Sequence, residues 1–379
     1  MAVRRISGTP LKINPLNWMA RLVVALVFCL VFVGALVTSW QAGMAVPDWP
    51  LSFGSLNPDG WWANFMVRLE HGHRLLAALV GLAVGVLCAA VWGNWLALGI
   101  AFLVSVVASF SGRLLGAPPI VLAHLGVWPA AIGFLVCLVK RGAFGSRVGS
   151  VERRLAVAAF VLVCFQATLG GLRVTQETAG AVTVATALRI VHGCVAQAFL
   201  VVLVALAVRL ALWRDVSLAG GAVAPSASLR WVWAGVVAVY GQLILGASMR
   251  HLGAGLAIPT FPAADPSGSW IPKTHNLYTD LNFGHTRLGA VFVLLIVLWA
   301  AANVLRSRVG SLNARFWARL GGVVVCLQAL LGVLVVLHQK PKTLASVHVV
   351  LGAALLSALT ATLVHVSGFK RPLEEGGAR

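Results

Sequence analysis

The sequence predicts an all-α polytopic membrane protein made of two tandem four-helix-bundle repeats with an inserted two-helix hairpin. Three observations predict this fold: an apolar composition, recurring long apolar runs, and motifs that recur at equal spacing. Of the 379 residues, 60% are hydrophobic and only 10% are charged, whereas a soluble domain has about 25% charged residues. So few polar groups could not cover the surface of a water-soluble fold of this length.

The apolar runs recur along the whole chain, and each is long enough for a helix that crosses a hydrocarbon core of about 30 Å. A transmembrane strand barrel is excluded, because the runs are continuously apolar and do not alternate with polar residues. We expect about ten membrane helices, at residues 20–40, 73–93, 96–111, 119–139, 155–172, 185–208, 231–249, 285–305, 319–337 and 343–366.

The formal charge of +19 could indicate a nucleic-acid partner, so its distribution matters more than its sum. Nineteen of the 29 basic residues lie at the two ends and in alternate loops, such as residues 140–154 and 306–319. This pattern orients helices in a lipid bilayer and predicts that both termini are cytoplasmic. We therefore expect a multi-pass protein of the cell inner (cytoplasmic) membrane with no nucleic-acid partner, whose first apolar run is retained as a span.

Recurring motifs predict the repeats. The segment GMAVPDWP at 43–50 matches GLAIPTFP at 255–262, and Pro50 and Pro262 each precede a histidine by 23 residues. Further on, QATLGGLRV at 166–174 matches QALLGVLVV at 328–336. The predicted units are a cytoplasmic segment (1–18), a first repeat (19–215), a cytoplasmic linker (216–230), a second repeat (231–367) and a cytoplasmic tail (368–379).

The first repeat is longer than the second. His73 and His192 are 119 residues apart, whereas His285 and His348 are 63 apart. The 56 additional residues contain two apolar runs, which predicts a helical hairpin inserted near 94–145. His124 in this hairpin competes with His192 for the repeat position, and the QATLGGLRV motif before His192 favours the latter.

Four histidines, His73, His192, His285 and His348, stand at matching positions where apolar runs begin. Ionisable groups at membrane depth are costly and indicate a functional site. Two imidazoles on different helices can hold haem iron from both sides, whereas the further ligands that zinc needs are missing. The candidate partners of the haem propionates on the outer side are Arg74, Arg173, Arg189, Arg250, Arg287, Lys273, Lys340 and Lys342.

One glutamate distinguishes the two repeats. Glu70, His73 and Arg74 share one helix face, whereas His71 points to the opposite side. Asn282 stands where the second repeat would have Glu70. This asymmetry predicts one reactive haem site with a proton-handling group and one supporting haem site.

Together, Glu70-x-x-His73-Arg74, the Gln-Ala-x-Leu-Gly motifs and the four histidines resemble the heme A synthase family, from about residue 20 to 366. The resemblance implies an oxidoreductase that converts a methyl group of haem O to a formyl group, giving haem A for cytochrome c oxidase. It implies that His73 and His192 hold the iron of the substrate haem O, with Glu70, His73 and Arg74 as catalytic residues. It also implies that His285, His348 and Arg287 bind a haem b cofactor.

The chain departs from the family pattern in three places. Residues 41–69 contain no cysteine, and Thr286 replaces the arginine expected beside His285, leaving Arg287 as the substitute. The third is the inserted hairpin, whose His124 competes with His192. The implied partners are haem O, haem O synthase, assembly factors of cytochrome c oxidase and an unidentified electron acceptor. Two other classes remain open at this stage. A haem b electron-transfer cytochrome would use the same histidines, and a transporter would also have repeats.

Overall fold

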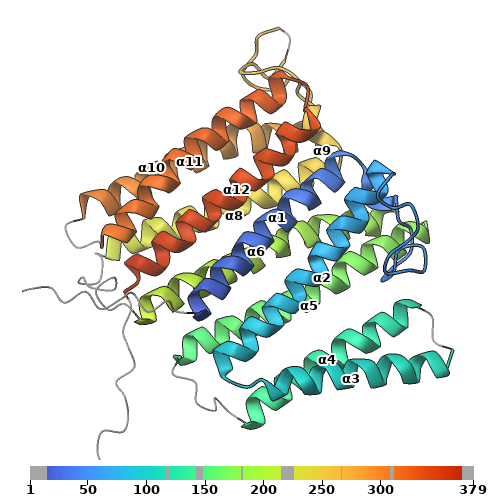
Figure 1. Ribbon diagram of the computed structural model, residues 1–379. Coiled ribbons are helices and arrows are strands. Elements are labelled where there is room, and N and C mark those ends of the chain that lie inside the picture. Colours follow the sequence, from blue (N-terminus) through green and yellow to red (C-terminus); the bar gives the residue numbers. More distant parts are fainter. Residues whose placement is uncertain are drawn as a thin grey trace, which may run out of the picture.

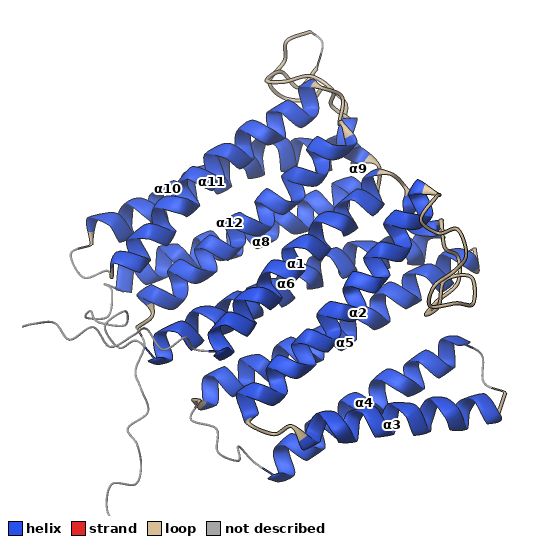
Figure 2. Cartoon of the chain, in the orientation of Figure 1, coloured by secondary structure: helices blue, strands red, loops and turns tan. Residues whose placement is uncertain are grey.

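The computed structural model describes residues 15–116, 119–141, 148–180, 182–214, 226–265, 267–307 and 311–368. The described residues form helices and loops with no strand (Figure 2), which confirms the all-α prediction. The elements are α1 (Pro15–Ser39), η1 (Ala42–Met44), α2 (Phe65–Trp92), α3 (Leu96–Leu114), α4 (Pro119–Arg141), α5 (Ser150–Thr178), α6 (Val182–Arg214), α8 (Ser226–His251), η2 (Ala254–Leu256), α9 (Leu277–Phe283), the π-helical turn η3 (Gly284–Gly289), α10 (Ala290–Arg306), α11 (Leu312–Leu337) and α12 (Lys342–Val366).

Eight helices of the described residues are long and apolar enough to cross a membrane, where α9, η3 and α10 count as one continuous helix. Two shorter apolar helices, Leu96–Gly112 and Gly126–Lys140, form the hairpin of α3 and α4. The protein is thus a multi-pass membrane protein, and each of its apolar helices overlaps one of the ten runs expected from the sequence.

The helices lie roughly parallel, with the hairpin at one edge beside α2 and α5 (Figure 1). The two long loops, residues 40–64 and 252–276, lie at the same end of the helices, and we call this end the loop side. The start of α1 and the end of α12 lie at the opposite end (Figure 1). Four helices of each repeat therefore present the same ends to the same side.

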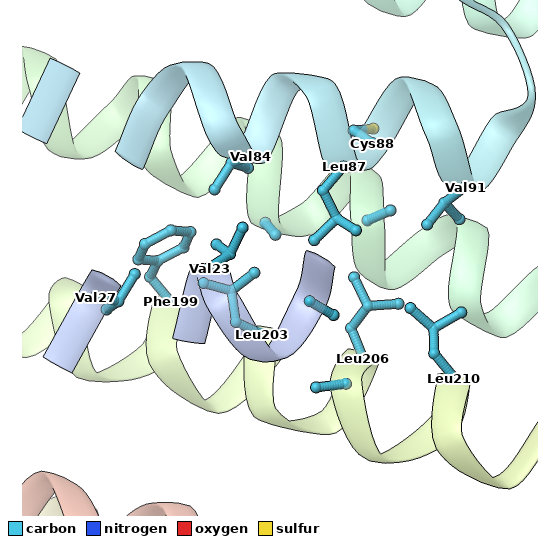
Figure 3. Packing of buried hydrophobic residues seen from close by; sticks show 14 of the residues in the cluster. Val23, Val27, Val84, Leu87, Cys88, Val91, Phe199, Leu203, Leu206 and Leu210 are labelled. Carbon is cyan, nitrogen blue, oxygen red and sulfur yellow. The ribbon is translucent and has the colours of Figure 1, made fainter. Parts of the chain in front are cut away.

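The core of the first repeat is built by α1, α2 and α6. Val23 and Val27 of α1 point toward Leu87 of α2 and toward Phe199 and Leu203 of α6 (Figure 3), and all five are almost fully buried. Lipid is as apolar as these side chains, so helix association in a membrane depends on close van der Waals packing. Branched and small side chains supply that close fit here.

The two helices that carry His73 and His285 begin earlier than their apolar runs. Asn64 caps α2 by accepting hydrogen bonds from the amides of Met66 and Val67, and Asn276 caps α9 in the same way. The predicted starts at 73 and 285 are therefore wrong by eight residues each, because charged and polar residues such as Arg68 and Asp280 interrupt the apolar run in the first two turns. Both histidines lie in the third turn of a helix, inside its end.

The hairpin packs mainly through α4 on α5. The rings of Phe134 and Phe160 are 4.5 Å apart between centroids, and the Trp128 indole donates a hydrogen bond to the Thr168 hydroxyl over 3.1 Å.

Several predictions lie outside the described residues: most of the segment 1–18, most of the linker 216–230, nearly all of the tail 368–379, and the side chain of His124.

Candidate functional site

Each of the four predicted histidines lies against a glycine of the helix that precedes its own. A methyl group added to the glycine would approach the Cε1 atom of the imidazole to 3.5 Å or less in every case. At 2.7–3.1 Å, as for three of the four glycines, an ordinary Cβ would displace the ring, whereas the fourth distance, 3.5 Å, is a normal van der Waals contact. The pairs are Gly34 with His73 at 3.0 Å, Gly170 with His192 at 3.5 Å, Gly246 with His285 at 2.7 Å, and Gly332 with His348 at 3.1 Å.

Three of these glycines follow a glutamine by four residues, one helical turn. The glutamine side-chain amide donates to the backbone carbonyl of the histidine: Gln166 to His192 at 2.9 Å, Gln242 to His285 at 2.7 Å, and Gln328 to His348 at 3.0 Å. Gln242 was missed in the sequence, although Gln-x-x-Leu-Gly at 242–246 repeats the spacing found at 166–170 and 328–332. In α1 the equivalent position is Leu30, so His73 alone lacks this support.

The second repeat brings His285 and His348 together. Their ring centroids are 6.5 Å apart, and the ring planes are at 81°. A metal–imidazole bond of about 2 Å, plus about 1.2 Å from ring nitrogen to ring centre, places two axial rings about 6.4 Å apart. The observed separation therefore fits two axial ligands of one haem iron.

The polar atoms of the four histidines also fit haem ligands. In each ring, Nδ1 is buried and has no hydrogen-bond partner among the described residues. His73 of α2 and His192 of α6 occupy the positions in the first repeat that His285 and His348 occupy in the second. Among the described residues no group of three or more His, Cys, Asp or Glu side chains converges.

Glu70 is buried beside the first pair, with 3% of its side chain exposed. Its Oε1 atom accepts hydrogen bonds from Arg74 at 3.0 Å and from Arg173 of α5 at 3.4 Å. Its Oε2 atom is buried and has no hydrogen-bond partner in the described part of the protein. One carboxylate oxygen is thus fixed by two cations while the other is available to a bound molecule.

Arg74 joins α2 to the first long loop. Beside its bond to Glu70, its guanidinium donates to the backbone carbonyls of Val46 at 2.8 Å, Asp48 at 2.6 Å and Leu51 at 2.9 Å. The predicted catalytic arginine therefore uses most of its donors on the loop, and it positions the Glu70 carboxylate.

Arg287 does the same in the second repeat, although it lies one residue later than the counterpart of Arg74. It donates to the carbonyls of Thr260 and Ala263, which match Asp48 and Leu51 in the repeat register. The π-helical turn η3 holds Thr286 as an additional residue and so carries Arg287 to the place that Arg74 has in α2. A π-turn accommodates one extra residue within a helix and is frequent at functional sites.

Asn282, the counterpart of Glu70, is fully buried and has partners at both ends of its amide. Its Nδ2 donates to the carbonyl of Ala254 at 2.8 Å, and its Oδ1 accepts from Thr286 at 3.2 Å and Arg287 at 3.4 Å. The second repeat thus has a neutral, satisfied group where the first has a carboxylate with a free oxygen.

His71 of α2 points toward the first long loop. Its Nδ1 atom is 2.8 Å from the hydroxyl of Ser52, and its ring meets the Trp61 indole edge-on at 4.7 Å between centroids. Its ring therefore contacts the loop, and its partners differ from those of Glu70.

The other cations proposed for haem propionates have varied partners. Arg250 of α8 donates to the Ala35 carbonyl and the Ser39 hydroxyl of α1, each at 2.7 Å, and so links the two repeats. Lys342 lies 4.0 Å above the Trp40 ring, and Lys273 donates to Ser267. The Lys340 side chain covers Gly255.

Comparisons with known proteins agree with this arrangement. A family model described as cytochrome oxidase assembly protein (COX15-CtaA) matches residues 16–360, a range that contains all four histidines. A protein named heme A synthase from Rhodopseudomonas palustris (strain BisB5) is 24% identical over 366 residues, 92% of this chain and 90% of the relative. Another of that name from Symbiobacterium thermophilum is 30% identical over 75% of this chain and 74% of the relative.

A shorter match, to the heme A synthase of Chelativorans sp. (strain BNC1), is 37% identical over 136 residues, which are 33% of this chain and 37% of that protein. The family model and the long matches cover both repeats and the segments between them. The chain belongs to the cytochrome oxidase assembly protein family.

Proposed function

We propose that this membrane protein is a heme A synthase that oxidises a methyl group of haem O to a formyl group, giving haem A for cytochrome c oxidase. The first repeat (19–215) binds the haem O substrate through His73 and His192. The second repeat (231–367) binds haem b through His285 and His348. The family match and the relatives of this name support the activity, and the two histidine pairs support the assignment of two haems.

The observation that carries the proposal is the difference between Glu70 and Asn282. A group that accepts or releases protons is needed where a carbon atom is oxidised, and a buried carboxylate with one free oxygen supplies it. The second repeat has the same fold but a neutral amide at this position. It can therefore hold a haem as a cofactor, and it lacks the proton-handling group needed to oxidise that haem. A methyl carbon beside Glu70 would be oxidised in two steps, each of which adds one oxygen from water, releases two protons and passes two electrons to the acceptor. The resulting geminal diol would lose water to give the aldehyde.

The residues around the two sites have separate tasks in this proposal. Arg74 and Arg173 fix one oxygen of Glu70 and leave the other toward the substrate. The glutamines and glycines orient the imidazoles, and Arg287 holds the second loop in place. When bound, haem b supplies redox chemistry, and the protein supplies position and exclusion of side reactions.

The cellular setting follows from the same reading. The protein lies in the inner (cytoplasmic) membrane with both termini in the cytoplasm, receives haem O from a haem O synthase, and passes electrons to an acceptor. It delivers haem A to the assembly of cytochrome c oxidase. A haem b electron-transfer cytochrome is the alternative, because it would use the same histidine pairs, but it gives no reason for the carboxylate of Glu70.

The test is production of haem A in cells that make haem O and lack another source of haem A. We expect haem A in extracts from cells with the parent protein, and none with Glu70→Gln, which keeps the size of the side chain and removes the titratable group. Haem b retained by purified Glu70→Gln serves as the control for folding. If the parent yields no haem A but retains haem b, the electron-transfer cytochrome is the better reading.

A further inference from the structure

The first repeat contains a row of alternating charges that leads from Glu70 to the loop side. Arg173 bridges Glu70 at 3.4 Å and Glu177 at 4.0 Å, and Glu177 in turn pairs with Arg189 of α6 at 3.3 Å. We call these four residues the ion-pair ladder. The exposed fraction of the side chain rises along it, from 3% for Glu70 through 14% and 21% to 28% for Arg189.

The second repeat shows that the fold does not need the ladder. In the repeat register, the counterparts of Glu70, Arg173, Glu177 and Arg189 are Asn282, Val335, Gln339 and Ala345. All four are uncharged, yet the helices pack in the same way around His285 and His348. Removing charges from water costs several kcal/mol for each ion, so a ladder present in only one repeat points to a function of that repeat.

The ladder also has polar atoms that its own members leave unsatisfied. Oε2 of Glu70, Oε2 of Glu177 and Nε of Arg189 are buried and have no hydrogen-bond partner among the described residues. Each carboxylate therefore keeps one oxygen without a hydrogen bond, and in Glu177 this oxygen is the one that faces Nη1 of Arg173 at 4.0 Å. The charged groups that face Glu177 are Arg173 on its own helix and Arg189 on α6.

We propose that Glu177 is the outer station of a proton path that connects Glu70 with water on the loop side. This inference rests on the proposed function, in which Glu70 handles protons at the reacting methyl. Arg173 stays protonated throughout, because a guanidinium does not lose its proton in proteins. It fixes both carboxylates and does not carry the proton itself.

The transfer balances as an exchange between two carboxyl groups. Protonated Glu70 gives its proton through a bridging water to the Glu177 carboxylate, which leaves Glu70 ionised and Glu177 protonated. Glu177 then releases the proton to water on the loop side. Proton transfer in the opposite direction, from water through Glu177 to Glu70, protonates Glu70 again. Glu70 can therefore return to its starting protonation state between oxidation steps. Glu177 is thus a positioning and relay residue that does not touch the substrate.

The experiment measures haem A formation by the purified, haem b-loaded protein with added haem O. We expect Glu177→Gln to retain haem b and bind haem O normally but to form haem A about tenfold more slowly, since proton transfer is worth that much or more. Glu177→Asp, which restores a carboxylate, should recover most of the rate. Acetate, a small weak acid, should accelerate Glu177→Gln several-fold by replacing the missing group.

Glu152→Gln is the matched control, because Glu152 is also a buried, ion-paired glutamate of α5 but lies at the opposite end of the helix, paired with Arg209 at 2.6 Å. Acetate should not change its rate. If Glu177→Gln does not load haem b, a larger solvent isotope effect in Glu177→Asp than in the parent is the expected result.

Three results would overturn the proton path. The first is a Glu177→Gln rate equal to that of the parent. The second is a loss of rate that neither aspartate nor acetate restores. The third is a higher haem O requirement with an unchanged maximal rate, which would assign the ladder to substrate binding. None of them bears on the parent's own conversion of haem O to haem A, which tests the proposed function separately.

Discussion

In this proposal each haem-binding histidine packs against a glycine of the preceding helix, and a single added methyl group can disturb the tightest of these contacts. Gly246 shows the closest contact, since an added methyl would lie 2.7 Å from Cε1 of His285. Side-chain carbons do not approach so closely, and a ring inside a packed helix bundle has little room to move. The orientation of the imidazole therefore depends on the absence of a side chain on the neighbouring helix.

We predict that Gly246→Ala lowers the haem b content of the purified protein by half or more, because the new methyl rotates His285 away from His348. Gly241→Ala is the control: Gly241 lies on the same helix and has nothing within 4 Å of an added methyl. Haem content is measured from the reduced spectrum of the purified protein. Equal haem content in the two variants would show that the glycine contact does not orient the ring.

The sequence indicated which residues belong to the candidate site, but it did not indicate most of the contacts that these residues make. The four histidines, Glu70 and its counterpart Asn282 follow from repeat spacing, because the spacing records which positions are equivalent. The bonds of Arg74 and Arg287 to loop carbonyls could not be predicted, since they depend on how a loop of more than 20 residues folds back on its helix. The pairing of Arg173 with Glu70 depends on the rotation of α5 against α2, which no local pattern determines.

At the scale of an element, the π-helical turn η3 resolves the apparent absence of an arginine beside His285. Thr286 is the additional residue, and its hydroxyl donates to the Asn282 carbonyl at 2.7 Å. By residue spacing Thr286 is the counterpart of Arg74. By its hydrogen bonds to the loop, Arg287 is the counterpart of Arg74. A helix assumed to be regular hides this equivalence, so Arg287 could only be a candidate in the sequence.

We predict that deletion of Thr286 is tolerated, because it turns Gly-His-Thr-Arg-Leu into Gly-His-Arg-Leu, the order found at 72–75 in the first repeat. The π-turn should become a regular α-turn with His285 and the arginine still in place. Haem b content and the midpoint of thermal unfolding in detergent should stay close to those of the parent.

Deletion of Leu294 is the control for this prediction. Leu294 lies in the regular helix α10, where loss of one residue rotates the following turns by about 100° relative to the preceding ones. That variant should lose haem b and unfold at lower temperature. Equal damage from both deletions would mean that η3 does not absorb an extra residue.

At the scale of the whole molecule, the hairpin of α3 and α4 is an addition to the edge of the first repeat. In the second repeat the equivalent helices α10 and α11 are joined directly through residues 307–311. The hairpin meets the remaining helices mainly where Phe134 and Trp128 of α4 contact α5. Gln166 and Gly170, which support His192, lie on α5 on either side of Thr168. The other residues that support the histidines lie on helices that the hairpin does not contact through these two side chains.

We predict that replacing residues 93–149 by the five-residue connection 307–311 leaves the haem b content of the second repeat unchanged. The reason is that α8 to α12 supply both ligands and their supporting glycines and glutamines without the hairpin. The measurement is haem b per purified protein, and truncation of α12 serves as the control that must lose it. Loss of haem b from the hairpin replacement would show that the two repeats depend on each other through this edge.

The guanidiniums of Arg74 and Arg287 have a consequence for how a large, flat molecule reaches the histidines. Together they make five hydrogen bonds to loop carbonyls, three from Arg74 and two from Arg287. Each bond to a charged group is worth about 1.5–3 kcal/mol, and several must break at once before either loop can lift. Apolar contacts between lipid-facing helices cost less to separate, because surrounding lipid replaces them. We therefore expect a large, flat ligand to reach the histidines laterally from the bilayer, at a rate that depends on the fluidity of the membrane.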